Sequence, residues 1–328
     1  MKFVKSFLLF SLFIFDSNAF AQGGYAGAFL RMGIAPRSEA MGRAYVAVVE
    51  GTESAFYNPA SAAMLERREL NTSFRPLTLD RSFAVIGIGL PIHPKADTTG
   101  RVLNGGLCFN WIHAGVNNIE ARDFDGEKYA TLSNSENAFS LSFALQPHQR
   151  ATIGLSVLVV MNRLTGVTQD NGNLSASTTG FDLGALVEPL DGVRVGVTAR
   201  NLNLKYSWNT QKVYERGTTN YDRFPRAVRA GVAISRPWPW LTAAADYERR
   251  ISISREKRKF SDETWHVGAV ANYRQMVQVR LGLNDGQPTF GAGYIFGLLG
   301  RKSELHYAFV THPESLDGDH VFGWAFVF

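Results

Sequence analysis

The 328-residue chain contains a single cysteine, Cys108, so it cannot form an intramolecular disulfide. Small exported modules that lack a large core usually depend on several disulfides, and this chain therefore does not belong to that class. A free cysteine is most often a buried and inert thiol, which is what we expect of Cys108.

Long apolar runs are also scarce. Beyond the N-terminal region, no stretch approaches the roughly 20 apolar residues that a transmembrane helix needs. Hydrophobic residues nevertheless make up 45% of the chain, aromatic residues make up 12%, and there are 31 glycines. A membrane protein without such helices has to be a closed β-barrel, because every backbone polar group in lipid must be hydrogen-bonded within the protein. A secreted soluble β-protein is the alternative that composition leaves open.

Charge of one sign is not concentrated anywhere in the chain. The formal net charge is +5 and the basic residues are scattered, so no nucleic-acid partner is expected. The seven histidines lack metal-ligand spacing such as His-x-x-x-His, and no Gly-x-Ser-x-Gly nucleophile motif occurs. We therefore expect no enzymatic activity, no metal and no cofactor.

The N-terminus reads as a secretory signal peptide. Lys2 and Lys5 precede an apolar run from Phe7 to Phe15, and Ala19-Phe20-Ala21 then forms a small-x-small cleavage pattern. The apolar run is too short to cross a bilayer as a helix. The sequence thus predicts a cleaved signal peptide over 1–21 and a mature chain that begins near Gln22.

Alternation of apolar with small or polar residues is the main structural signal in the rest of the chain. Around residues 139–146, for example, Phe139, Leu141, Phe143 and Leu145 alternate with Ser140, Ser142, Ala144 and Gln146. The same template predicts strands near 70–79, 82–92, 102–113, 137–146, 150–162, 178–188, 193–203, 226–235, 240–249, 264–273, 276–284, 289–297, 303–312 and 320–328. These are about fourteen strands, an even number, as single-chain bacterial barrels require. The predicted fold is all-β, a transmembrane antiparallel barrel over 70–328.

The connections between the predicted strands support a barrel. Both ends of an even-stranded barrel lie in the periplasm, so every second connection should be a short periplasmic turn. Short turns are predicted at 147–149, 189–192, 237–239 and 274–275, and long loops at 114–136, 164–177, 204–225 and 251–263. Two connections break the rule, since 80–81 is short and 93–101 is longer than a turn needs.

The final strand has the features of a barrel-assembly signal. Outer-membrane barrels commonly end in a strand that contains a glycine, then alternating apolar positions, and finally a terminal aromatic residue, and the assembly machinery reads this end. Gly323, Phe326 and Phe328 match that pattern, whereas Val321 stands where a polar residue is usual. The aromatic residues of this strand are expected to face the bilayer.

Residues 22–69 do not alternate and are predicted to form a separate N-terminal plug. Asn58-Pro59-Ala60 resembles a turn that starts a short helix, because Asn-Pro favours turns and proline suits a first helical turn. One interpretation is a surface turn before a helix. The other is a hatch that packs inside the barrel.

The stretch Gly33–Leu65 resembles the N-terminal signature of the PorV/PorQ family, which is related to the FadL-type fatty-acid transporters. The similarity lies in Ala40-Met41-Gly42-Arg43-Ala44-Tyr45-Val46-Ala47-Val48 and in Tyr57-Asn58-Pro59-Ala60. The segment 306–320 is similar to the closing hairpin of the same family, and together the two stretches cover about a quarter of the chain. Arg43 and Ser61 depart from the pattern, which usually has glycine at both positions.

This resemblance implies a 14-stranded FadL-like barrel with an N-terminal plug. It implies outer-membrane lipid and the barrel-assembly machinery as partners. It leaves two functions open, which are transport of hydrophobic small molecules and a role as a barrel component of a type IX-like system that handles secreted proteins.

Strand parity places a set of charged and polar side chains in the lumen. They are Asp182, Glu188, Arg194, Arg200, Arg229, Asp246, Glu248, His266, Asn272, Arg274, Gln278 and Arg280. On the lipid face each charge would cost ~2–4 kcal/mol near the bilayer midplane. These side chains either form an ion-pair and water network that holds the plug, or they line a selective polar conduit.

Overall fold

The computed structural model describes residues 25–94, 103–168, 172–213, 216–253, 259–312 and 315–328. The predicted signal peptide lies outside the described residues. Within the described residues, no helix combines the length and the apolar character needed to cross a membrane.

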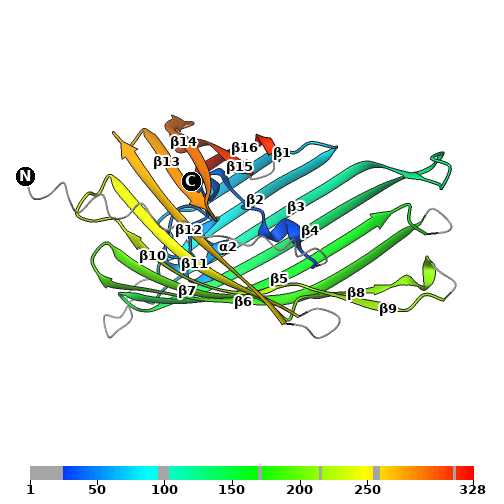
Figure 1. Ribbon diagram of the computed structural model, residues 1–328. Helices are drawn as coiled ribbons and strands as arrows, with labels where there is room; N and C mark the ends of the chain where they lie inside the picture. Colours follow the sequence, from blue (N-terminus) through cyan, green and yellow to red (C-terminus); the bar gives the residue numbers. More distant parts are fainter. Residues whose placement is uncertain (1–24, 95–102, 169–171, 214–215, 254–258, 313–314) are drawn as a thin grey trace, which may run out of the picture.

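Fourteen strands form one closed antiparallel barrel, which confirms the predicted fold and strand number (Figure 1). The strands are β1 (Glu69–Pro76), β2 (Arg81–Ile92), β3 (Asn104–Arg122), β4 (Lys128–His148), β5 (Ala151–Thr165), β6 (Asn173–Leu190), β7 (Val193–Leu202), β10 (Arg226–Ile234), β11 (Leu241–Ile253), β12 (Lys259–Tyr273), β13 (Val277–Asn284), β14 (Gln287–Leu298), β15 (Arg301–His312) and β16 (Ser315–Val327). Each strand pairs with its neighbour in sequence, except that β7 pairs with β10, and β16 closes the ring against β1. Closure leaves no open sheet edge around the wall.

The barrel has two different ends. At the turn end, short connections such as 149–150, 191–192 and 299–300 join the strands, and Phe328 donates its backbone N–H to the Arg68 carbonyl (3.0 Å). At the loop end the hairpins are uneven in length, and the β3–β4 hairpin and the hairpin of β8 (Lys205–Asn209) and β9 (Thr219–Arg223) reach well beyond the β1–β2 hairpin (right in Figure 1).

The predicted long loops at the loop end are largely wrong, because strands continue through them. The β3–β4 ladder runs to the pair Arg122–Lys128, the β5–β6 ladder to Thr165–Asn173, and the β11–β12 ladder to Ile253–Lys259. Residues 203–225 contain a separate two-stranded sheet of β8 and β9. The short η3 (Thr210–Lys212) lies between these two strands in the chain. Apolar alternation marks only the part of a strand that faces an apolar medium, whereas backbone pairing continues beyond it with hydrophilic side chains.

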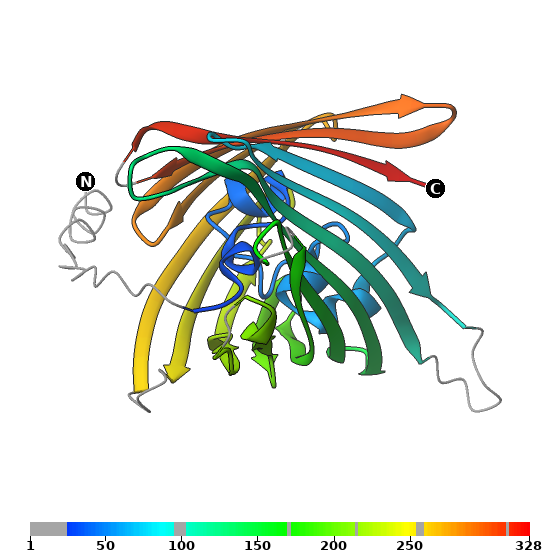
Figure 2. The same cartoon turned by 90° about the vertical axis from the view of Figure 1, so that its right-hand side faces the viewer.

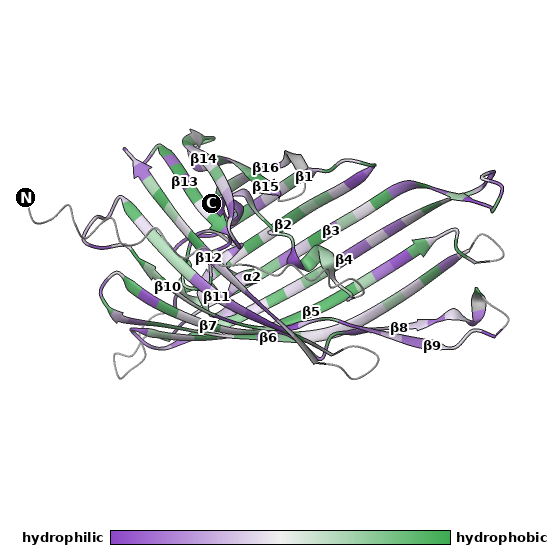
Figure 3. Cartoon of the chain, in the orientation of Figure 1, coloured by the Kyte–Doolittle hydropathy of each residue, from purple (hydrophilic) through white to green (hydrophobic). Residues whose placement is uncertain are grey.

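The outer face of the wall is apolar, as the alternation predicts. Leu141, Leu281 and Phe290 are each about half exposed, at 51%, 54% and 47%, whereas Ser140 and Ser142 on the opposite face of β4 are buried. Figure 3 shows apolar and polar residues interleaved along the strands, with hydrophilic residues gathered on the projecting β3–β4 hairpin. Exposed apolar side chains on this scale have a physical rationale only if another apolar phase covers them.

Residues 25–65, here called the luminal segment, lie inside the wall (Figure 2). The segment contains η1 (Ala28–Arg31), α1 (Pro36–Ala40), α2 (Ser54–Tyr57) and η2 (Pro59–Met64). It begins at the loop end, where Ala26 donates its N–H to the Arg223 carbonyl (3.3 Å), and it leaves at the turn end, where β1 begins at Glu69. Residues 33–63 are buried, except for the half-buried Arg43 and 49–51.

Glycines of the wall make room for this segment. At nine glycines in the described part of the wall, an added Cβ would lie 1.8–2.6 Å from an atom of the luminal segment. They are Gly87, Gly106, Gly154, Gly184, Gly196, Gly268, Gly282, Gly291 and Gly323, on β2, β3, β5, β6, β7, β12, β13, β14 and β16. Pairs of them are directly opposite each other on neighbouring strands, such as Gly154 with Gly184 and Gly268 with Gly282. At these positions the wall presents no side chain to the segment, which fits the close backbone approach that only glycine permits.

Candidate functional site

Asn58 joins the luminal segment to the wall. Its Nδ2 donates to the carbonyls of Val46 (2.9 Å) and Ala185 (3.1 Å), and its Oδ1 accepts from the Ala60 N–H (3.1 Å) at the start of η2. Pro59 occupies the first helical position, where its missing N–H costs nothing. Asn58 is fully buried and out of reach of bulk water, so its polar atoms depend on these hydrogen bonds within the protein.

Side chains of the wall bind the backbone of residues 40–46. Asp246 accepts from the N–H groups of Tyr45 (2.8 Å) and Val46 (3.0 Å). Thr289 Oγ1 accepts from the Gly42 N–H (3.1 Å) and donates to the Ala40 carbonyl (3.2 Å), while His266 Nδ1 lies 3.0 Å from the Gly42 carbonyl. These contacts fix the path of the backbone, whatever side chains it carries.

Arg43, one of the departures from the PorV/PorQ pattern, has a left-handed backbone with φ of 66°. That conformation is disfavoured for residues other than glycine, which explains why glycine is usual here. Arg43 instead forms an ion pair with Glu39 (2.7 Å), and Glu39 also pairs with Arg75 of β1 (2.9 Å). Burial acts to raise the pKa of Glu39, but the charges of Arg43 and Arg75 hold that pKa at about 2.

A second buried cluster surrounds Arg37 of α1. Its guanidinium lies 3.4 Å from Glu53, 2.9 Å from Glu69 and 3.9 Å from Glu304, so one cation faces three carboxylates from the segment, β1 and β15. Burial raises the pKa of Glu53 to about 7, in spite of Arg37, and the nearby charge of Glu69 adds to the rise. No sequence pattern singles out Arg37 or Glu53, because a segment without alternation gives no inward or outward face.

The predicted luminal residues of the wall fall into several groups. Asp182 and Arg200 form one ion pair (3.5 Å), Arg229 pairs with Glu248 and lies 3.8 Å from Asp246, and Arg280 pairs with Glu50 of the luminal segment. Arg194 is half-buried near the turn end and, among the described residues, joins none of these groups.

Arg274 does not face the lumen, so the prediction from strand parity is wrong at this residue. It is exposed in the turn after β12, with φ of 50°, because the strand ends at Tyr273 and alternation no longer applies there. In the last strand, Gly323 faces inward against Pro36 of α1, while Phe326 and Phe328 face outward. The role of this strand as an assembly signal stays a prediction.

The expectation of a buried thiol at Cys108 is confirmed. Cys108 is buried in an apolar cluster with Leu65 and Ala144. In the described part of the chain, no group of three or more His, Cys, Asp or Glu side chains is arranged to hold a metal ion.

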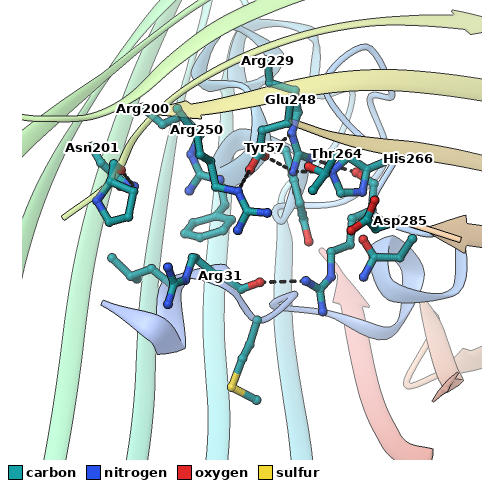
Figure 4. A pocket seen from close by; sticks show the side chains of 17 residues that line it. Arg31, Tyr57, Arg200, Asn201, Arg229, Glu248, Arg250, Thr264, His266 and Asp285 are labelled. Carbon is teal, nitrogen blue, oxygen red and sulfur yellow. Dashed lines mark hydrogen bonds and ion pairs between the residues drawn. The ribbon is translucent and has the colours of Figure 1, made fainter. Parts of the chain in front are cut away.

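A cavity of about 160 Å³ lies at the loop end of the lumen, between the start of the luminal segment and strands β7 and β10–β12 (Figure 4). Part of its lining is apolar, from Leu30, Met32, Phe56, Tyr57, Pro225 and Ala227. The rest includes five arginines, Arg31, Arg43, Arg200, Arg229 and Arg250, and two acidic residues, Glu248 and Asp285. These residues come from distant parts of the sequence, and only the closed barrel brings those parts together.

Comparisons with known proteins identify the fold. No protein family and no curated protein matches the sequence. Among solved structures, the toluene transporter TbuX of Ralstonia pickettii is similar with a TM-score of 0.60 at 14% identity, over 90% of this chain and 98% of that one. The Pseudomonas putida toluene transporter TodX gives 0.57 at 14% identity (90% and 97% covered), and a Pseudomonas aeruginosa FadL homologue gives 0.51 at 12% (93% and 98% covered).

At these identities the similarity shows a shared fold and nothing finer. The chain has the FadL-like barrel fold that the resemblance implied, over nearly its whole length. None of these three structures is described as a PorV or PorQ protein.

Proposed function

We propose that this protein is an outer-membrane channel for hydrophobic small molecules, and that the luminal segment is its plug. The observation that carries the proposal is the filled lumen, in which a closed barrel with an apolar outer face surrounds a segment held by hydrogen bonds and ion pairs. Proteins with this fold include transporters of toluene, a small apolar molecule. A cavity with a partly apolar lining at the loop end provides a first place for a ligand to rest.

The proposal includes location and orientation. The apolar face of the wall is suited to lipid, and the exposed aromatic residues Trp238, Trp240 and Tyr273 near the turn end are suited to a membrane interface. The turn end would then face the periplasm, the loop end would face the exterior, and residues 1–21 would be the cleaved signal peptide.

Uptake by intact cells tests the proposal. A hydrophobic fluorescent probe that the intact outer membrane excludes should enter faster into cells that express the protein than into cells with an empty vector. A second control is the protein without Phe328, which we expect not to insert. Equal rates of entry in all three, with the full-length protein present in the outer membrane, would contradict a transport function.

The alternative is a barrel component of a type IX-like secretion system, related to PorV and PorQ. One structural observation favours it beyond the sequence resemblance. The β3–β4 hairpin projects past the β1–β2 hairpin, and near its tip Phe124 is fully exposed and Tyr129 is 71% exposed. Large exposed aromatic side chains outside the lipid region suit contact with another protein.

The two functions predict opposite effects of one deletion. If the hairpin binds secreted proteins, removal of residues 117–130 should abolish their appearance at the cell surface and leave probe uptake unchanged. If the protein is a transporter only, the same deletion should leave secretion intact. A matched control is deletion of residues 210–218 from the β8–β9 hairpin at the same end.

A further inference from the structure

Among the described residues, Arg31 is the arginine of the cavity lining that forms no ion pair. Arg43 pairs with Glu39, Arg200 with Asp182, Arg229 with Glu248, and Arg250 with Glu248 and Asp262. Among the described residues, no carboxylate lies within ion-pair distance of the Arg31 guanidinium, and only its backbone carbonyl is engaged, as acceptor from Arg43 (2.7 Å).

The surroundings of Arg31 favour an anion. Burial and then the positive charge of Arg250 lower the pKa of Arg31, and the charges of Asp262 and Glu248 offset this effect only in part. The cavity lining carries five positive and two negative side chains. The planar guanidinium of Arg31 presents a fork of N–H donors. A carboxylate or a phosphate matches this fork with two parallel hydrogen bonds.

The remaining walls restrict the rest of the ligand. Leu30, Met32 and the rings of Phe56 and Tyr57 form an apolar side of the cavity. Arg200 lies over the Phe56 ring at 4.2 Å and so already covers one aromatic face. An apolar cavity of roughly 150 Å³ holds a benzene-sized molecule, so the space of about 160 Å³ admits one ring or a short chain and excludes a long one.

We propose that this cavity binds a small organic acid with a single ring or a short apolar chain, and that its carboxylate pairs with the Arg31 guanidinium. The proposal rests on the proposed function for its role, since it names the substrate class of the channel. It differs from a site for toluene, which carries no charge for Arg31 to pair with.

Isothermal titration of the full-length protein in detergent tests this site without any transport. Benzoate should bind, and its neutral isostere benzamide should bind about ten- to a hundredfold more weakly, since it lacks the charge-assisted hydrogen bonds. Arg31→Gln should weaken benzoate binding by a similar factor and leave benzamide unchanged. The control Arg81→Gln removes an exposed arginine at the start of β2 and should change neither. Oleate should not compete with benzoate.

Each result decides the proposal. Equal binding of benzoate to the wild type and to Arg31→Gln would overturn it, as would tighter binding of benzamide or toluene than of benzoate. Heat-modifiable migration of Arg31→Gln shows that the barrel is folded, and Arg31→Lys, which keeps the charge, should bind benzoate with intermediate affinity. If benzoate binds as expected but cells show no uptake of the hydrophobic probe, the site stands and the proposed transport function fails.

Discussion

The luminal segment meets the wall along two very different contact surfaces. Against β3–β6, the helix η2 packs on glycines and small side chains, and no ion pair joins it to these strands within the described residues. Against β1 and β10–β15, the segment is held by buried ion pairs and by side chains that bind its backbone, such as Arg37 with Glu69 and Asp246 with Tyr45. We refer to these as the apolar contact and the polar contact.

For the proposed plug, the difference between the two contacts separates fit from release. The apolar contact depends on shape, and shape is insensitive to pH and salt. The polar contact depends on compensated charges, which are costly to bury and become unfavourable as soon as one partner changes. We infer that the apolar contact provides the fit, and that the polar contact determines when the segment is released.

The largest effect should come from filling the apolar contact. A Cβ on Gly154 would lie 2.4 Å from the backbone of Pro59 and Ala60, and backbone atoms cannot rotate away. Since β4 and β6 hold β5 in place, Gly154→Val should displace η2 and open the lumen. In a planar bilayer the wild type should be nearly closed and the variant should conduct.

Gly297→Val is the matched control for this experiment. Gly297 lies on β14, and an added Cβ there meets nothing within 4 Å, so the variant should remain closed. A closed Gly154→Val channel would show that η2 is not seated against β5, and it would remove the distinction between the two contacts.

A smaller but still large effect should come from breaking the polar contact at Arg37. Arg37→Met leaves Glu53 and Glu69 without a cation, whereas Glu304 keeps its pair with Lys302, and removal of one partner of a buried pair typically costs about 3–5 kcal/mol. The wall has its own hydrogen-bond ladder, so it should stay folded while the segment loosens. Limited proteolysis should then cut residues 25–65 and spare the strands.

The control for Arg37 is Arg122→Met, which removes an exposed ion pair with Glu120 on the β3–β4 hairpin. Exposed pairs contribute little to stability, so no new cleavage is expected. Protection of the segment in Arg37→Met equal to that of the wild type would mean that the polar contact does not hold it.

The sequence predicts the wall far better than it predicts these contacts. Lipid-facing alternation is a local pattern, and for this reason strands such as 137–146 and 276–284 can be found without knowledge of their neighbours. The glycines at 154 and 184 lie within predicted strands, but only the closed barrel shows that they face Pro59 and Asn58. A contact between distant parts of the chain has no local signal.

The same reason explains the partial prediction of the site. Asp246 and Arg229 lie on alternating strands, so parity alone assigns them to the lumen. Arg31 and Arg37 lie in a segment of short helices and turns, where no period fixes a face. The sequence Asn58-Pro59 predicts a turn, but the hydrogen bond from Asn58 to the Ala185 carbonyl of β6 depends on the tertiary fold.

A moderate effect is expected from Asn58→Ala, which affects both contacts at once. The change leaves the carbonyls of Val46 and Ala185 and the Ala60 N–H without their partner, at a cost of roughly 1–3 kcal/mol. Single-channel recordings should show brief openings between long closed periods. Asn209→Ala removes a similar cap at an exposed position, where Asn209 accepts from the Gln211 N–H, and should leave the record unchanged. Steady full opening of Asn58→Ala would mean that this residue, and not the Arg37 cluster, dominates the seal.

The smallest effect should be the pH dependence of the polar contact through Glu53. Glu53 faces Arg37 and Glu50 of the luminal segment and Glu69 of β1, and Arg37 in turn contacts Glu304 of β15. Burial raises the pKa of Glu53 from 4.5 to about 7 when the segment is seated. A group with a raised pKa in the closed state stabilises that state fully below its free pKa, and this contribution is lost as the pH rises through the higher value. The seal should therefore be tightest in mild acid and should loosen as the pH rises from about 5 to about 8. Glu53→Gln, which mimics the protonated form, should stay closed with little dependence on pH in this range. Open probability measured across the series checks both statements, and a seal that tightens with rising pH would show that Glu53 is ionised when the segment is seated.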